Sequence, residues 1–176
     1  MLKIFTTQLS SYFKRIADKE EFNLEDGARI LAQAAVGEGS IYIHGIDEME
    51  AVTLEATKSA EPLPYAKPLQ DENVSSLTPI DCVLLISRFS TDKSAINLAQ
   101  KLQEKHIPFV SISAIPKDVS EPSLHELSDA HINTQLVQPL IPGEDGSRFG
   151  FPAVMTALYA YYGLAFTLKE IIEEYE

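Results

Sequence analysis

Apolar residues recur at intervals of three and four positions over residues 2–16. This spacing places the apolar side chains on one face of a helix and predicts that the chain starts helical. The same period predicts a second helix over 24–35, with Asn23 and Asp26 as its capping pair and Gly37 as its stop. The first part of the chain is therefore expected to contribute two helices.

Four short runs rich in β-branched or apolar residues lie farther along the chain, at 40–45, 81–87, 108–113 and 130–136. The run at 81–87 is almost entirely apolar, which is typical of a parallel strand covered on both faces. A further segment, 61–68, holds three prolines, whose missing backbone donors restrict it to an edge strand or an extended loop. These segments predict the sheet.

Helical patterns separate and follow the predicted strands. They are a helix that begins near Asp47 and Glu50, a helix through 95–102, a short turn capped by Ser123 and Glu126, a long helix from about 149 to 163, and a terminal turn capped by Thr167 and Glu170. The segment 137–146 contains two prolines and two glycines, which favours a loop.

Strands that alternate with helices predict parallel pairing through right-handed crossovers. The expected fold class is α/β, with a doubly wound, five-stranded and mainly parallel sheet covered by helices on both faces. One domain is expected over 1–176, with amino-terminal helices over 1–38, an α/β core over 39–136 and carboxyl-terminal helices over 147–176. In such sheets ligands bind beyond the carboxyl ends of the strands, where the strand order reverses. The loops 44–48 and 87–91 are therefore the candidate site.

The charge balance narrows the possible partners. The chain has 26 acidic and 14 basic residues and a net charge of -12, so it lacks the positive charge that attracts a phosphate backbone, and nucleic acid is not an expected partner. The single cysteine, Cys82, lies in the apolar run 81–87, which predicts a buried thiol. Without a possible intramolecular disulfide and without a secretory signal, the expected location is the cytoplasm.

The segment 151–168 carries no charged residue and approaches the length of a membrane span. It is diluted by Pro152, Gly163 and three tyrosines, so we expect a helix that is buried in a core or in an interface between subunits rather than a membrane helix. Its aromatic content exceeds what one small domain needs to cover, which predicts a symmetric homodimer or homotetramer.

The loop 87–91 could hold a phosphate. Hydroxyls of Ser87, Ser90 and Thr91, together with backbone donors at the start of the following helix, would face an anion that the helix dipole also favours. Arg88 adds a positive charge. Ser90 or Thr91 can equally be the N-cap of that helix, because hydroxyl residues are preferred there. Both roles are open at this point.

The run from Asp81 to Ser113, in which a strand ends at Ser87 and a helix and another strand follow, resembles the centre of the SIS, or sugar isomerase, domain. In that family the strand ends in Ser-x-Ser-Gly-x-Thr. Ser87 matches its first serine, whereas Phe89, Ser90 and Asp92 take the places of the second serine, the glycine and the threonine. The two amino-terminal helices, Gly45 after the first strand and the long last helix are also similar to the phosphoheptose isomerases of this family.

The resemblance implies binding of a phosphorylated sugar or sugar derivative at Gly45, Ser87, Arg88, Ser90 and Thr91, and possible isomerisation of a sugar phosphate. It equally implies an alternative: a non-catalytic SIS protein that acts as a regulatory or assembly partner through its oligomer surfaces. For Gly45 a tight strand-to-helix turn is the other interpretation.

Isomerisation between an aldose and a ketose needs a group that moves a proton and a group that polarises the carbonyl. The candidates are Glu55, close to where phosphoheptose isomerases carry a glutamate, and His44, at the end of the first predicted strand. A solvated helix carboxylate and a packed strand histidine are the alternatives for these two residues. The scattered histidines predict no metal site, and no cofactor is implied.

Overall fold

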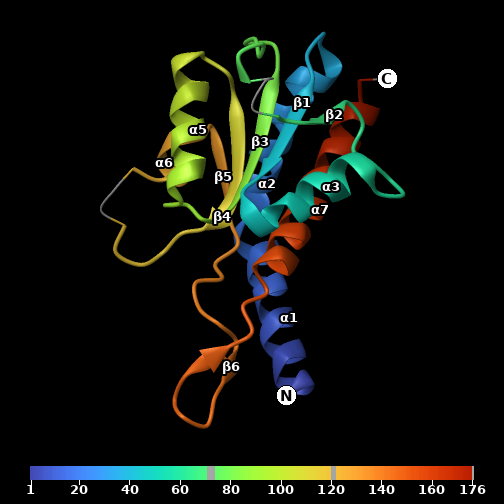
Figure 1. Ribbon diagram of the computed structural model, residues 1–176. Coiled ribbons are helices and arrows are strands. Elements are labelled where there is room, and N and C mark those ends of the chain that lie inside the picture. Colours follow the sequence, from blue (N-terminus) through green and yellow to red (C-terminus); the bar gives the residue numbers. More distant parts are fainter. Residues whose placement is uncertain (71–73, 120–121, 176) are drawn as a thin grey trace.

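A five-stranded sheet forms the centre of the molecule in a computed structural model, which describes residues 1–70, 74–119 and 122–175 (Figure 1). All four strand pairings are parallel, in the order β2-β1-β3-β4-β5. The strands are β1 (Ile41–Gly45), β2 (Ala66–Pro68), β3 (Cys82–Phe89), β4 (Phe109–Ala114) and β5 (Ala130–Asn133). The five strands expected from the sequence are therefore present, and the proline-rich segment supplies the edge strand β2.

Helices cover both faces of this sheet, which confirms the predicted α/β fold class. On one face lie α5 (Lys93–Glu104) and α6 (Leu124–Leu127), and on the other α2 (Glu21–Val36), α3 (Glu50–Lys58) and α7 (Ala153–Glu173) (Figure 1). Each face has its own apolar core, because side chains alternate between faces along a strand. Leu84 and Ile86 of β3 pack beneath α2 and α7, whereas Val83 and Leu85 pack beneath α5.

The central strands are buried as their apolar runs predicted. All six residues of β4 are buried, as are the first six of β3. Cys82 is 1% exposed, so the prediction of a buried thiol is confirmed. Burial raises the pKa of this thiol far above its usual value, because the thiolate would lose its hydration. Cys82 is thus a core residue of β3.

The second helix begins earlier than the sequence pattern indicated. Its N-cap is Glu20, and Asn23 lies inside the first turn of α2, so the predicted Asn23 cap is wrong. The carboxylate of Glu20 accepts hydrogen bonds from the Asn23 side-chain amide at 2.8 Å and from the Asn133 backbone N–H at 3.1 Å. A contact with β5 therefore fixes the junction between α1 (Leu2–Lys19) and α2.

The last helix is one continuous element. Thr167 bonds back to the carbonyl of Gly163 at 3.0 Å inside α7, so the predicted stop at Gly163 and the cap at Thr167 are wrong. Gly163 is retained because Leu24 of α2 packs against it, with 3.2 Å between a Leu24 methyl carbon and an added Cβ. Among the described helices, none is long and apolar enough to cross a membrane.

Two elements extend away from the sheet. The amino-terminal half of α1 projects beside a hairpin that the sequence pattern predicted as a loop, formed by β6 (Ile141–Pro142) and β7 (Arg148–Phe149) (Figure 1). The guanidinium of Arg148 donates hydrogen bonds to the carbonyls of Pro139 and Leu140 across the base of this hairpin. Its strands are two residues each, too short for a recognisable alternating pattern.

A buried chain of polar side chains runs between β4, β5 and α6. Ser111 lies 2.7 Å from Nδ1 of His131 and donates to Ser128 at 2.8 Å, and Ser128 in turn donates to the carbonyl of Leu124. Since the Ser111 proton is used in this chain, Nδ1 of His131 must be the donor to Ser111, which defines a neutral imidazole. Burial, and to a smaller extent the nearby ring of His125, lowers the pKa of His131 to about 3.

We expect stability to fall on acidification because of His131. Its folded pKa of about 3 lies below its ordinary value of 6.5, so the unfolded chain binds the extra proton first, and stability present above pH 6.5 is lost as the pH falls toward 3. The slope from this residue reaches about 1.4 kcal/mol per pH unit. Urea unfolding across this range should show a flatter pH dependence in His131→Gln. The exposed His125→Gln is the matched control, and an unchanged slope in His131→Gln would exclude this assignment.

Candidate functional site

The strand order reverses between β1 and β3, so this is the switch point at which α/β sheets bind ligands. Parallel pairing puts Gly45 at the end of β1 beside Ile86 of β3. The segments that follow the two strands, 46–49 and 87–92, therefore lie next to each other at one edge of the sheet. These are the two loops that the sequence analysis selected.

Gly45 sits where the chain turns sharply from β1 into the 3-10 helix η1 (Asp47–Met49). A Cβ at this position would lie 2.0 Å from the carbonyl oxygen of Met49, so only glycine permits the close approach. The Gly45 N–H donates to the hydroxyl of Thr53 at 2.9 Å, inside the core. The turn interpretation accounts for this glycine, and a contact between Gly45 and a ligand stays a prediction.

Two acidic residues, Asp47 and Glu48, follow this turn in η1. The backbone of Asp47 is in the left-handed region, with φ of 51°, a conformation that aspartate tolerates better than most residues. The backbone of Met49 requires glycine at position 45 whatever residues follow. The acidic pair therefore changes the charge of this edge of the sheet and leaves the turn itself unchanged.

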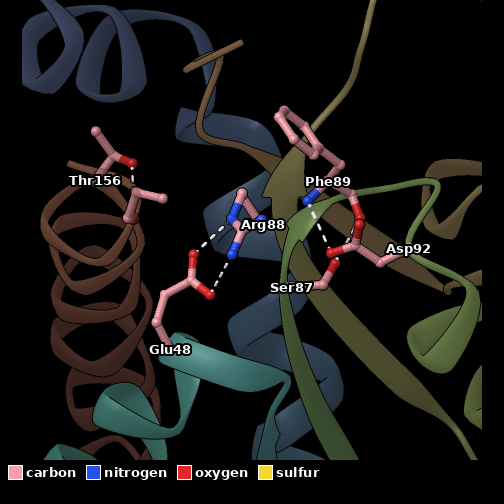
Figure 2. A network of polar contacts seen from close by, with 7 residues as sticks. Glu48, Ser87, Arg88, Phe89, Asp92 and Thr156 are labelled. Carbon is pink, nitrogen blue, oxygen red and sulfur yellow. Dashed lines mark hydrogen bonds and ion pairs between the residues drawn. The ribbon is translucent and has the colours of Figure 1, made fainter. Parts of the chain in front are cut away.

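Arg88 and Glu48 join the two loops through a bidentate ion pair (Figure 2). The guanidinium donates from Nε to Oε1 and from Nη2 to Oε2 of Glu48, both at 2.6 Å. The register between β3 and β4 shifts between Ile86 and Phe89, an irregularity of the kind that re-aims side chains beside functional sites. The bond to Arg88 also lowers the pKa of Glu48, so this carboxylate is ionised at neutral pH.

The other side of β3 is closed by bonds within the chain (Figure 2). The hydroxyl of Ser87 donates to the carbonyl of Phe89 at 2.8 Å, and a carboxylate oxygen of Asp92 accepts the Phe89 N–H at 3.2 Å. Burial raises the pKa of Asp92, although this hydrogen bond and Arg88 oppose the shift. The carboxylate of Asp92 thus occupies a backbone donor that was expected to face a phosphate.

Ser90 and Thr91 have different environments. Ser90 is wholly buried, with its N–H bonded to the carbonyl of Ala114 and its own carbonyl accepting from Leu124. Its hydroxyl has no hydrogen-bond partner among the described residues. Thr91 is half-buried in the turn, and neither residue caps α5, whose N-cap is Asp92. The open choice between N-cap and ligand contact therefore resolves against the cap for both residues.

A cleft of about 380 Å³ opens at the switch point, lined by Glu48, Arg88, Phe89 and Phe151. The rings of Phe89 and Phe151 meet edge to face, with centroids 5.9 Å apart. Phe151 precedes α7, and Figure 2 shows the start of this helix, marked by Thr156, on the Glu48 side of Arg88. The cleft thus combines one ion pair with two aromatic rings.

Sequence reasoning missed Glu48 and Phe151 as site residues. Glu48 is separated from Arg88 by 40 positions and Phe151 lies in the last quarter of the chain, so no local pattern connects them. The available signal was that Glu48 and Arg88 are opposite charges in the two loops next to the switch point. Only the register of β1 against β3 makes them neighbours.

The two candidate acid–base residues lie apart. Glu55 is on α3, which packs on the α7 face of the sheet, and its carboxylate accepts a hydrogen bond from the hydroxyl of Tyr162. His44 points to the opposite face, the same as Tyr42, and its Nδ1 lies 3.2 Å from the carbonyl of Leu69. The sheet therefore separates Glu55 from His44. In the parts of the chain that the structure describes, no group of His, Cys, Asp and Glu side chains could hold a metal ion.

Solved structures place this architecture in a known class. The chain is similar to phosphoheptose isomerase GmhA from Neisseria gonorrhoeae (TM-score 0.64, 12% identity, 98% of this chain and 97% of that one) and to E. coli CFT073 c3406 in complex with a sugar phosphate (0.68, 11%, 98% and 89%). It is also similar to the Vibrio vulnificus NanR protein complexed with ManNAc-6P (0.64, 15%), where the match covers 99% of this chain but only 62% of NanR. The chain has the sugar isomerase, or SIS, fold.

Sequence comparison defines the family. The model of a domain of unknown function, DUF2529, matches residues 1–172, and the chain belongs to this family. A relative in Bacillus subtilis (strain 168), named as the uncharacterized protein YwjG, is 47% identical over 175 residues, which are 99% of each chain.

We expect Gly45→Ala to destabilise the protein. The added Cβ would lie 2.0 Å from a backbone oxygen, so the turn from β1 to η1 must move, at a cost of about 1–3 kcal/mol in the free energy of unfolding. Denaturant unfolding measures this cost. Gly146→Asn is the control, since a Cβ there meets nothing within 4 Å and asparagine tolerates its φ of +82°. Equal stability of the Gly45→Ala variant would contradict the close approach.

Proposed function

We propose that this protein binds a phosphorylated sugar or sugar derivative in the switch-point cleft, with Arg88 as the anchor of the phosphate. The observation that carries the proposal is the position of Arg88, which faces the cleft between the ends of β1 and β3. A guanidinium presents two parallel N–H groups, and the bidentate geometry that Glu48 now uses also fits two oxygens of a phosphate.

The rest of the cleft suits a sugar. The rings of Phe89 and Phe151 offer apolar surface for the C–H groups of a sugar, while the carboxylate of Glu48 can accept hydrogen bonds from hydroxyls. The volume of about 380 Å³ lies within the usual range of small-molecule sites. Similarity to the two proteins complexed with sugar phosphates, one of them ManNAc-6P, supports this ligand class.

The remaining predicted contacts have secondary places in this proposal. Thr91 and Gly45 flank the cleft from the two loops that follow β3 and β1. Ser87 and Ser90 are buried, so they would support the loop from beneath rather than face the ligand.

The proposal concerns binding and leaves out isomerisation. Glu55 and His44 lie on opposite faces of the sheet, so they support no shared proton transfer on one substrate. Glu55 is also distant from the cleft, because its partner Tyr162 lies nine positions along α7 from Ala153, about 14 Å in a helix. A binding role agrees with the residues that line the cleft.

We predict that pentose, hexose or hexosamine phosphates stabilise the protein against heat, whereas the same sugars without phosphate do not. A ligand at one hundred times its Kd adds about 2.7 kcal/mol to the free energy of unfolding. Arg88→Met should weaken binding about ten-fold or more, because a charge-assisted hydrogen bond is lost. Arg29→Met, which removes another exposed, ion-paired arginine, is the matched control. If no sugar phosphate stabilises the wild-type protein, the proposal fails.

A second candidate function, assembly through subunit contacts, is favoured by one face of α7. Four large apolar side chains on this helix are exposed at helical spacing: Met155, Tyr159, Tyr162 and Phe166. Exposed apolar stripes of this kind mark interaction sites, and a face without charge is where two acidic copies of this chain repel each other least. We propose that a second copy of the chain covers this face.

The expected outcome is a dimer or tetramer at micromolar concentration in multi-angle light scattering. Phe166→Glu should shift the protein toward the monomer, because the charge would be buried without a partner. Ile80→Glu changes an equally exposed apolar residue outside α7 and should leave the mass unchanged. A monomeric wild-type protein would rule out the assembly role.

A further inference from the structure

We propose that the switch-point cleft selects a ligand that carries an ammonium group as well as a phosphate, the class of phosphorylated amino sugars, and that Glu48 is the residue that makes the selection. The inference rests on the proposed function and concerns which sugar phosphates bind best. It starts from the ion pair between Glu48 and Arg88, which spans the cleft.

The first step is that Arg88 is not free. Glu48 already satisfies two of its N–H groups with short bonds, in the geometry that a phosphate would use. Both side chains are only partly exposed, 43% for Arg88 and 35% for Glu48. A phosphate that binds Arg88 must therefore displace the carboxylate, and Glu48 acts as an internal competitor of the ligand.

The second step concerns the displaced carboxylate. Arg88 is the single cation among the described residues that line the cleft, and the carboxylates of Asp47, Glu48 and Asp92 all lie close enough to act on its charge. A neutral sugar phosphate would take this one cation and leave three carboxylates beside a further anion. Like charges at such short range repel each other, so a ligand of this kind binds against the local field.

The third step is that an ammonium group removes this conflict. The phosphate takes the place of Glu48 on Arg88, and the ammonium takes the place of Arg88 on Glu48, so that both members of the ion pair exchange partners. An ammonium donates charge-assisted hydrogen bonds, which are stronger than those of a sugar hydroxyl. The faces of Phe89 and Phe151 in the same cleft also favour a nearby cation.

The pair differs from the other exposed ion pairs of the protein. Arg29 bonds to Glu25 and Lys169 to Glu173 across one turn of a single helix, a common surface arrangement. Glu48 and Arg88 come from two strand ends, meet across the switch point and border a cleft. A surface ion pair alone explains none of these three features.

Calorimetric titration tests the inference with glucosamine 6-phosphate, N-acetylglucosamine 6-phosphate and glucose 6-phosphate, at a pH below the pKa of the amine. We expect the amino sugar phosphate to bind about five-fold more tightly than the other two, the range of a partly exposed ion pair. In Glu48→Gln this preference should disappear, and glucose 6-phosphate should bind about as much more tightly because its competitor is gone. Glu25→Gln, which breaks an ion pair on α2, should keep the wild-type preference.

The outcomes separate this inference from the proposed function. Equal affinity for the three phosphates in the wild-type protein would overturn the selection for an ammonium and leave phosphate binding intact. Preference that persists in Glu48→Gln would overturn the role of Glu48. Binding of none of the three phosphates, nor of any other sugar phosphate, would overturn the proposed function itself.

Discussion

Parallel pairing of β1 with β3 brings Gly45 beside Ile86, and the position of every cleft residue depends on this register. A shift of one residue would turn the side chains of one strand to the opposite face. Ile43 and Leu84 would then leave the core beneath α2 and α7, so the core itself holds the register. The ion pair between Glu48 and Arg88 is a consequence of this packing, since each residue follows its strand at a fixed distance.

The sequence predicted most of the sheet because buried parallel strands are local signals. Runs such as 81–87 and 108–113 are apolar enough to be recognised alone, and their alternation with helical periods indicates the parallel topology. Helix ends were predicted less well, because tertiary contacts decide them. Glu20 caps α2 while it also binds the Asn133 backbone, which is 113 positions away, and Leu24 packs against Gly163 within a continuous helix.

The candidate site was predicted in place but only partly in chemistry. The switch-point rule located both loops, and hydroxyl residues suggested a phosphate cradle. In the structure Ser87 bonds to the Phe89 carbonyl, and Asp92, in the place of the threonine of the SIS pattern, accepts the Phe89 N–H. A motif lists residue types but not the bonds they have already made. The chain's own carboxylates hold positions that a bound anion could use.

The two faces of the sheet also differ in how they use polar residues, and this bears on where a ligand can act. Beneath α5 and α6, Ser111, Ser113 and His131 are buried and bond to one another, so their polar groups are satisfied without a ligand. At the switch point, Glu48 and Arg88 are partly exposed and bond to each other across an open cleft. A buried network resists exchange because opening it leaves polar atoms without partners, whereas an ion pair at a cleft can exchange partners at small cost. Binding is therefore expected at the switch point rather than at the serine–histidine cluster, although the latter contains the more familiar catalytic residue types.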